Sequence, residues 1–156
     1  MSNGVSVELR KLEDIFYTEN THLVEVLDKK QLGVWDSKKT RGYGIVICDY
    51  KGLKFGIPLR SKLHPKNNFC FKTVGDKGLD FTKSVLLEKD EYISQRPFII
   101  PNAEHTKIID KAHHITTKFS KYVERYVLAV SKQDKNILRN YKFSTLQNYH
   151  VHLGID

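Results

Sequence analysis

Three residues whose side chains suit binding and cleavage of a phosphodiester lie close together in the chain. They are Arg60, Ser61 and His64, and Pro58 and Pro65 lie on either side of them. A guanidinium clamps two phosphate oxygens, a hydroxyl donates a further hydrogen bond, and an imidazole exchanges protons near neutral pH. Because proline fixes φ and ends regular pairing, the pattern predicts a phosphate-binding loop at the end of a strand.

The reaction that best fits these residues is RNA cleavage by transesterification. The RNA supplies its own nucleophile, the 2′-hydroxyl, so the protein needs a base, an acid and donors to the phosphorane oxygens. We expect His64 to take one proton-transfer role and Ser61 to position the phosphate. Charge stabilisation falls to Arg60 or Lys39, with Arg41 as an alternative cation.

A predicted hairpin would bring those cations together. The turn Tyr50-Lys51-Gly52 separates two apolar runs, residues 43–49 and 53–59, which we interpret as paired strands. Antiparallel pairing places the start of the first strand beside the end of the second. Lys39 and Arg41 precede the first strand, so we expect them to form the other side of a groove that faces the loop.

Basic residues are concentrated in one third of the chain. The formal net charge is +8, and residues 29–77 hold 12 basic and three acidic side chains, a balance of +9. Such a field indicates a polyanionic partner, with a solubilising surface as the alternative. The RNA contacts predicted in this region are Trp35, Lys38, Arg41, Tyr43, Lys54, Lys62 and Lys66.

The composition is that of an ordinary globular protein. With 156 residues, 40% apolar and 28% charged, the chain is expected to form one domain over residues 1–156. It has no apolar run long enough to cross a bilayer and no signal peptide, so we expect a cytoplasmic protein without membrane contact. No cofactor motif or metal-ligand spacing is present, and we predict neither a cofactor nor a metal. Cys48 and Cys70 are expected to be buried free thiols.

Hydrophobic periodicity predicts an α+β fold. Short strands with tight turns favour a strongly bent antiparallel sheet or small barrel, followed by a long helix in the C-terminal half. Asn20 or Thr21 is a candidate N-cap for a helix. The expected strands are 5–12, 43–49, 53–59, 69–71, 83–88 and 92–100, the last at an edge; short helices are expected within 13–30, a long helix over 104–132 and a helical turn within 133–141.

Two segments resemble a known family. Gly44-Ile45-Val46 through Ile57-Pro58-Leu59-Arg60-Ser61-Lys62 is similar to the core of the ToxN/AbiQ endoribonuclease toxins, whose pattern is Gly-Ile-Val, a hairpin, then Pro-Leu-Thr-Ser-Pro-Lys. These are the protein halves of bacterial type III toxin–antitoxin systems, and the CptN branch looks closest. Phe143-Ser144-x-Leu146 resembles a C-terminal motif of the same family.

The resemblance implies a bent, SH3-like antiparallel barrel with surrounding helices. It also implies metal-independent cleavage of cellular RNA that leaves a 2′,3′-cyclic phosphate. The implied partner is a small structured RNA antitoxin, cut by the toxin from a repeat precursor, which occupies the active groove. An RNA-bridged oligomer of several toxin and RNA copies would follow.

Residue by residue, the resemblance is incomplete. Ser61 falls on the family's active-site serine, and Lys39 falls near its lysine before the hairpin when one residue is inserted. Trp35 lies where a tyrosine is expected. Arg60 replaces the family threonine, and Lys62-Leu63 replaces the proline-lysine pair. The residue types therefore leave two other hypotheses open, a non-catalytic RNA-binding module and a ribonuclease toxin restrained by a protein antitoxin.

Overall fold

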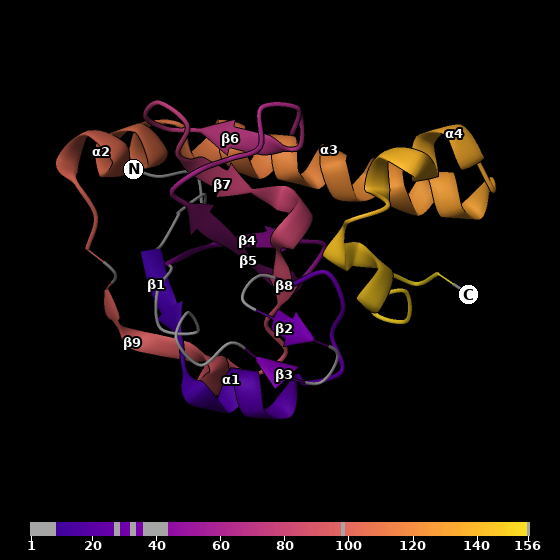
Figure 1. Ribbon diagram of the computed structural model, residues 1–156, viewed down its shortest axis with the longest axis horizontal. Helices are drawn as coiled ribbons and strands as arrows, with labels where there is room; N and C mark the ends of the chain where they lie inside the picture. The colour runs from indigo at the N-terminus through magenta and orange to yellow at the C-terminus, as the bar shows by residue number, and fades with distance from the viewer. Residues whose placement is uncertain (1–8, 27–28, 32–33, 36–43, 98, 156) are drawn as a thin grey trace.

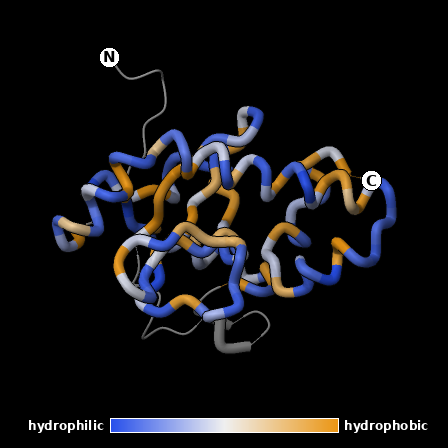
Figure 2. The backbone as a smooth tube through the Cα atoms, turned by 90° about the horizontal axis from the view of Figure 1, so that it is seen from above, coloured by the Kyte–Doolittle hydropathy of each residue, from blue (hydrophilic) through white to orange (hydrophobic). Residues whose placement is uncertain are grey.

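An antiparallel sheet packed against a long helix forms the centre of the protein (Figure 1). The structure, a computed structural model, describes residues 9–26, 29–31, 34–35, 44–97 and 99–155. Hydrophobic stretches gather toward the middle of the molecule, and hydrophilic stretches run along its outer loops and helices (Figure 2). No helix in these ranges combines the length and apolar character needed to cross a membrane.

The main sheet has seven strands in the order β6-β7-β5-β4-β1-β9, with β8 paired to β5 beside that path. All its pairings are antiparallel, which confirms the α+β class. β6 and β9 lie at the two ends and do not pair with each other, so within the described ranges the sheet is open where a closed barrel was expected. The strands are β1 (Leu9–Leu12), β4 (Ile45–Tyr50), β5 (Leu53–Arg60), β6 (Cys70–Lys72), β7 (Gly78–Asp80), β8 (Val85–Leu86) and β9 (Ile93–Pro97), and β2 (Lys29–Gln31) and β3 (Val34–Trp35) form a separate pair.

The predicted hairpin is confirmed as β4 and β5. Lys51 and Gly52 both have positive φ, 46° and 85°, the conformation that closes two-residue hairpin turns. β5 continues through Pro58, because the neighbouring N–H of Leu59 donates to the Gly44 carbonyl at 2.9 Å and keeps the ladder intact. Arg60 is therefore the last residue of a paired strand, where the sequence indicated a loop.

The helices differ from expectation at two points. Asn20 caps the C-terminal end of α1 by donating from its amide to the Phe16 carbonyl at 2.7 Å, so the predicted N-cap is wrong. The single long helix is interrupted at Lys111, whose φ of −107° and ψ of 18° depart from helical values. The helices are α1 (Asp14–Glu19), α2 (Asn102–Asp110), α3 (Ala112–Ser131) and α4 (Lys135–Leu138), with 3-10 turns η1 (Phe81–Lys83), η2 (Asp90–Tyr92), η3 (Arg139–Tyr141) and η4 (Thr145–Asn148).

Aromatic side chains join α3 to the sheet. The Phe119 ring lies 5.4 Å from the ring centroids of both Phe55 and Phe81, and all three side chains are buried. Edge-on contacts of this kind add to the free energy gained by burial. Cys48 and Cys70 are buried free thiols, as predicted, and burial raises the pKa of Cys48 to about 11.

A tight contact fixes β7 against the loop that follows β5. A Cβ added to Gly78 would lie 2.3 Å from the Phe71 carbonyl oxygen and 2.8 Å from Leu63 Cδ1. Leu63 is buried, and its N–H donates to the Asp76 carbonyl at 2.7 Å. Leu63 therefore anchors the loop after β5 to the core, although its neighbours Lys62 and His64 are exposed.

Candidate functional site

A pocket of about 610 Å³ lies beside the C-terminal end of β5. The loop after β5, the β7–η1 segment, α3 and the segment before η4 also contribute to it. Most of the residues that line it are of polar or charged type, and they come from parts of the chain that are far apart in the sequence. These are Arg60, His64, Lys66, Asn67, Asn68, Phe69, Asp80, Thr82, Lys83, Arg125, Asn140, Phe143 and Ser144.

The charge of this lining is strongly positive. Four cations, Arg60, Lys66, Lys83 and Arg125, meet one carboxylate, Asp80, which leaves a formal balance of +3. Cations that converge on a concave surface concentrate the potential there and attract anions. The pocket therefore suits a phosphate-bearing ligand of nucleotide size.

Asp80 organises the pocket wall. Only 1% of its surface is exposed, and its Oδ2 accepts from Arg60 Nη1 at 3.1 Å. Its Oδ1 accepts from Asn67 Nδ2 at 3.1 Å and from the backbone N–H and hydroxyl of Thr82 at 3.0 and 2.6 Å. A buried carboxylate with this many donors is well compensated. Asp80 thus holds Arg60 in place, and the remaining guanidinium N–H groups are left to contact a ligand.

His64 lines the pocket, and one of its ring nitrogens is held by the backbone. Its Nδ1 accepts a hydrogen bond from the backbone N–H of Lys66 at 3.1 Å, so the neutral ring carries its proton on Nε2. Nε2 has no hydrogen-bond partner within the described part of the chain. The backbone carbonyl of His64 also accepts from Asn67 N–H at 2.9 Å, which ties this turn to the Asp80 cluster. The imidazole is thereby oriented with Nε2–H as its remaining donor.

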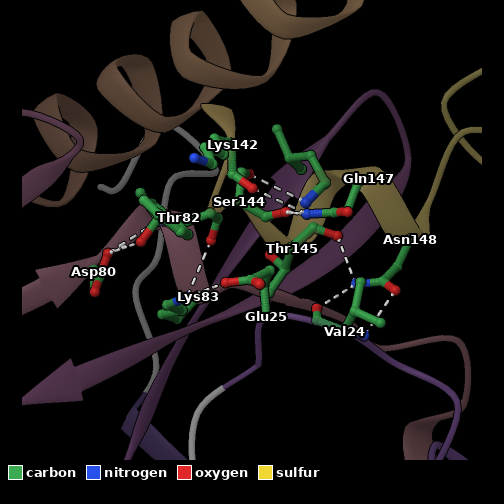
Figure 3. A network of polar contacts seen from close by, with 12 residues as sticks. Val24, Glu25, Asp80, Thr82, Lys83, Lys142, Ser144, Thr145, Gln147 and Asn148 are labelled. Carbon is green, nitrogen blue, oxygen red and sulfur yellow. Dashed lines mark hydrogen bonds and ion pairs between the residues drawn. The ribbon is translucent and has the colours of Figure 1, made fainter. Parts of the chain in front are cut away.

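Lys83 is the most enclosed cation of the pocket. Its side chain is 17% exposed, and Nζ donates to the Phe143 carbonyl at 3.0 Å and lies 3.5 Å from the Glu25 carboxylate (Figure 3). Burial lowers the pKa of Lys83, and the charge of Glu25 partly opposes that shift. Lys83 joins η1 to the segment before η4, two regions separated by 60 residues.

Ser144 has a structural role. It is buried, its hydroxyl lies 2.5 Å from the Tyr122 hydroxyl, and its Oγ accepts from the Leu146 N–H at 3.1 Å as the cap of η4. These two contacts occupy the hydroxyl. Ser144 therefore fixes the backbone beside Phe143 and is not poised as a reactive group.

The residues predicted from the loop divide into two groups. Arg60, His64 and Lys66 line the pocket, whereas Ser61 and Lys62 are exposed and lie outside its lining. Lys54 lies near the opposite end of β5, roughly 20 Å along the strand from Arg60, and its Nζ is 3.4 Å from Asp90.

The other predicted residues cannot be placed in the same way. Lys38, Lys39, Arg41 and Tyr43 lie outside the described residues, as does the side chain of Trp35, whose backbone belongs to β3. The hydrogen bond between Leu59 and Gly44 shows that the chain enters β4 beside the end of β5. That Lys39 and Arg41 complete a groove there stays a prediction.

Sequence reasoning missed several pocket residues. Lys83 and Arg125 lie outside the basic third of the chain, and Asp80 belongs to β7, a three-residue strand that was not predicted. Only the motif that begins at Phe143 pointed to this part of the pocket. The sequence did not indicate that this motif would lie beside Arg60.

The chain matches no known family profile, no curated protein and no solved structure. Within the described ranges, no cluster of three or more His, Cys, Asp or Glu side chains could hold a metal ion.

Proposed function

We propose that this protein is an endoribonuclease toxin of a type III toxin–antitoxin system. One observation carries the proposal: the two segments that resemble the ToxN/AbiQ family meet at one cationic pocket. Arg60, from the first segment, and Phe143 and Ser144, from the second, all contribute to its lining. The two segments are more than 80 residues apart in the chain. Their meeting at a nucleotide-sized, positively charged pocket supports a shared role in binding RNA.

The proposed reaction uses the 2′-hydroxyl of RNA as nucleophile. A new bond forms between the 2′-oxygen and phosphorus, and the bond from phosphorus to the 5′-oxygen breaks. The 2′-hydroxyl proton passes to a base and the 5′-oxygen receives a proton from an acid, which leaves a 2′,3′-cyclic phosphate and a 5′-hydroxyl. His64 carries its proton on Nε2 in this tautomer, so it fits the acid's transfer, in which that proton passes to the leaving 5′-oxygen.

Fixed cations would stabilise the phosphorane. Arg60 is held by Asp80 before any ligand arrives, so little reorganisation is needed when negative charge develops. Lys83 adds a second charge from a partly buried position, where electrostatic interactions are less screened. Lys39 and Ser61 remain proposed contributors, as cation and phosphate donor respectively.

The resemblance also supplies the proposed partners and the finer architecture. The inhibitor is a small structured RNA bound over the pocket, and several toxin and RNA copies assemble through that contact. The SH3-like barrel belongs to the same proposal, and β5, which pairs with β4, β7 and β8, would be its central strand. The protein is proposed to act in the cytoplasm, where its RNA substrates are made.

The direct test is the chemistry of the RNA ends. Purified protein incubated with cellular RNA should generate 5′-hydroxyl and 2′,3′-cyclic phosphate ends, and Arg60→Gln should lower the cleavage rate at least about 100-fold. Lys51→Gln is the matched control, because it removes an exposed cation of the same basic region at the β4–β5 turn, outside the pocket lining.

The outcomes separate the alternatives. RNA binding without new ends would identify a non-catalytic RNA-binding module. A small coding gene beside the toxin gene, in place of tandem RNA repeats, would indicate a protein antitoxin. If the Arg60→Gln variant cleaved RNA as fast as the wild type, the pocket would not be the catalytic site.

A further inference from the structure

We propose that one side of the pocket is a nucleobase subsite, in which an unpaired RNA base stacks on Phe143 and is read by the amides of Asn68 and Asn140. This inference rests on the proposed function, because it takes RNA as the ligand. It adds to that function a means of selecting substrate: the pocket would accept single-stranded RNA and discriminate among bases.

Phe143 is an aromatic side chain left in solvent. It is 61% exposed, and among the large hydrophobic residues exposed in the described ranges it alone is aromatic. It is also the one member of that set that lines the pocket. Aromatic rings in this setting stack unpaired bases regardless of sequence, since every base has a π-face.

The backbone that carries this ring is firmly held. The Phe143 carbonyl accepts from Lys83 Nζ at 3.0 Å, and the next N–H, of Ser144, donates to the Tyr141 carbonyl at 2.9 Å. Tyr141 and Ser144 are both buried. The ring is therefore presented from a fixed position, which lowers the entropy lost when a base stacks on it.

A cation already lies against Phe143. The Lys142 ammonium is 5.4 Å from the centroid of its ring. A cation over one face of an aromatic ring is a favourable arrangement that leaves the opposite face free for stacking. Lys142 would also contact the RNA backbone beside the stacked base.

Two amides supply hydrogen-bonding groups in the same pocket. Asn68 and Asn140 are exposed members of its lining, and neither side chain has a hydrogen-bond partner within the described part of the chain. Asn67, by contrast, is engaged through both its amide nitrogen and its amide oxygen. A carboxamide offers donors and an acceptor, which match the hydrogen-bonding edges of a nucleobase.

The position of Lys83 indicates where the base would lie relative to the phosphate. This cation faces the pocket and also touches the backbone of Phe143, so the phosphate-binding side and the aromatic side are adjacent. A nucleotide whose phosphate contacts Arg60 and Lys83 would place its base toward Phe143. A base inside a duplex is already stacked and paired, so this subsite selects unpaired RNA.

The experiment measures binding of short single-stranded RNAs that carry 2′-fluoro groups and cannot be cleaved through the 2′-oxygen. Homopolymers of each base serve as probes, and 2-aminopurine in place of one base reports stacking by fluorescence quenching. Phe143→Ala should weaken binding about tenfold and remove the quenching, whereas Phe143→Trp should preserve both. Val151→Ala is the matched control, because Val151 is 86% exposed and lies outside the pocket lining.

Unchanged affinity and quenching in Phe143→Ala, with binding lost in Arg60→Gln, would overturn the base subsite and leave the proposed function standing. Full affinity in Phe143→Leu would also overturn it, since stacking requires the aromatic ring. If the wild-type protein bound no RNA and produced no cleaved ends, the proposed function itself would fail. Preference for one homopolymer that is lost in Asn68→Ala or Asn140→Ala would support base reading by the amides.

Discussion

The guanidinium of Arg60 lies 3.1 Å from the buried carboxylate of Asp80, across the junction between β5 and β7. The same carboxylate accepts three further hydrogen bonds from Asn67 and Thr82. A single acidic residue thus connects a strand end, a turn and a 3-10 helix on one wall of the pocket. Its position makes the stability of the fold and the placement of the main cation depend on the same contacts.

Replacement of Asp80 should destabilise the fold strongly. Asp80→Ala leaves the partly buried Arg60, Asn67 and Thr82 donors without their acceptor, and we expect a loss of about 3–5 kcal/mol in the free energy of unfolding. Urea unfolding monitored by circular dichroism measures the change. Asp90→Ala is the control, because Asp90 is 91% exposed in its contact with Lys54, and its loss should cost less than about 1 kcal/mol. Equal effects of the two substitutions would contradict the role assigned to Asp80.

A methyl group at position 78 should disturb the same wall. Gly78→Ala brings the new Cβ to 2.3 Å from the Phe71 carbonyl oxygen, so the β6–β7 pair must separate. We expect a destabilisation of about 1–3 kcal/mol or more, with weaker RNA binding as Asp80 shifts. Gly52→Ala provides a comparison in which the new Cβ meets no atom within 4 Å and only the positive φ is strained. If Gly52→Ala lowered the free energy of unfolding more than Gly78→Ala did, the close β6–β7 contact would not be the more demanding of the two positions.

The Cys48 thiol should contribute a pH-dependent part of the stability. Its pKa is about 11 in the folded protein, because burial disfavours the thiolate, against 9.0 for a free thiol. The folded state therefore holds this proton more tightly, and the stabilisation is complete below pH 9 and is lost as the pH rises to 11. The stability difference between wild type and Cys48→Ala should shrink by about 2–3 kcal/mol over that interval. Comparing the two proteins cancels the tyrosine titrations, and a difference that stays constant with pH would refute the assignment.

Arg125 should contribute to RNA affinity mainly through charge. It lies on α3, outside the basic third of the sequence, yet it lines the pocket. If it contacts a phosphate, Arg125→Gln should lower the slope of log affinity against log salt concentration by about 0.7. Fluorescence anisotropy at several salt concentrations gives this slope. Lys121→Gln, an exposed α3 position outside the pocket lining, should leave the slope unchanged.

Local patterns predicted the parts of the fold that depend on neighbouring residues. The hairpin turn at Lys51-Gly52 and the apolar stripe of α3 depend on conformational preferences and periodicity over a few residues. The break at Lys111 has no such signature, since lysine suits a helix interior. The lining of the pocket was only partly predictable, because it combines residues that are distant in the sequence. Arg60 and His64 lie close in sequence, whereas Lys83 and Asn140 meet them only through the tertiary fold.

Because residues 140–144 contribute to the pocket, the order of translation decides when the pocket can form. Asn140, Phe143 and Ser144 line one wall, and the contact between Lys83 and Phe143 joins that wall to η1. During translation the strands that carry Arg60 and Asp80 leave the ribosome well before this segment does, at a rate of roughly 5–20 residues per second. The nascent chain therefore lacks a complete pocket until residues 140–144 have emerged and packed. Under the proposed function, a chain that lacks these residues would be inactive on the RNA closest to it, the message from which it is being translated.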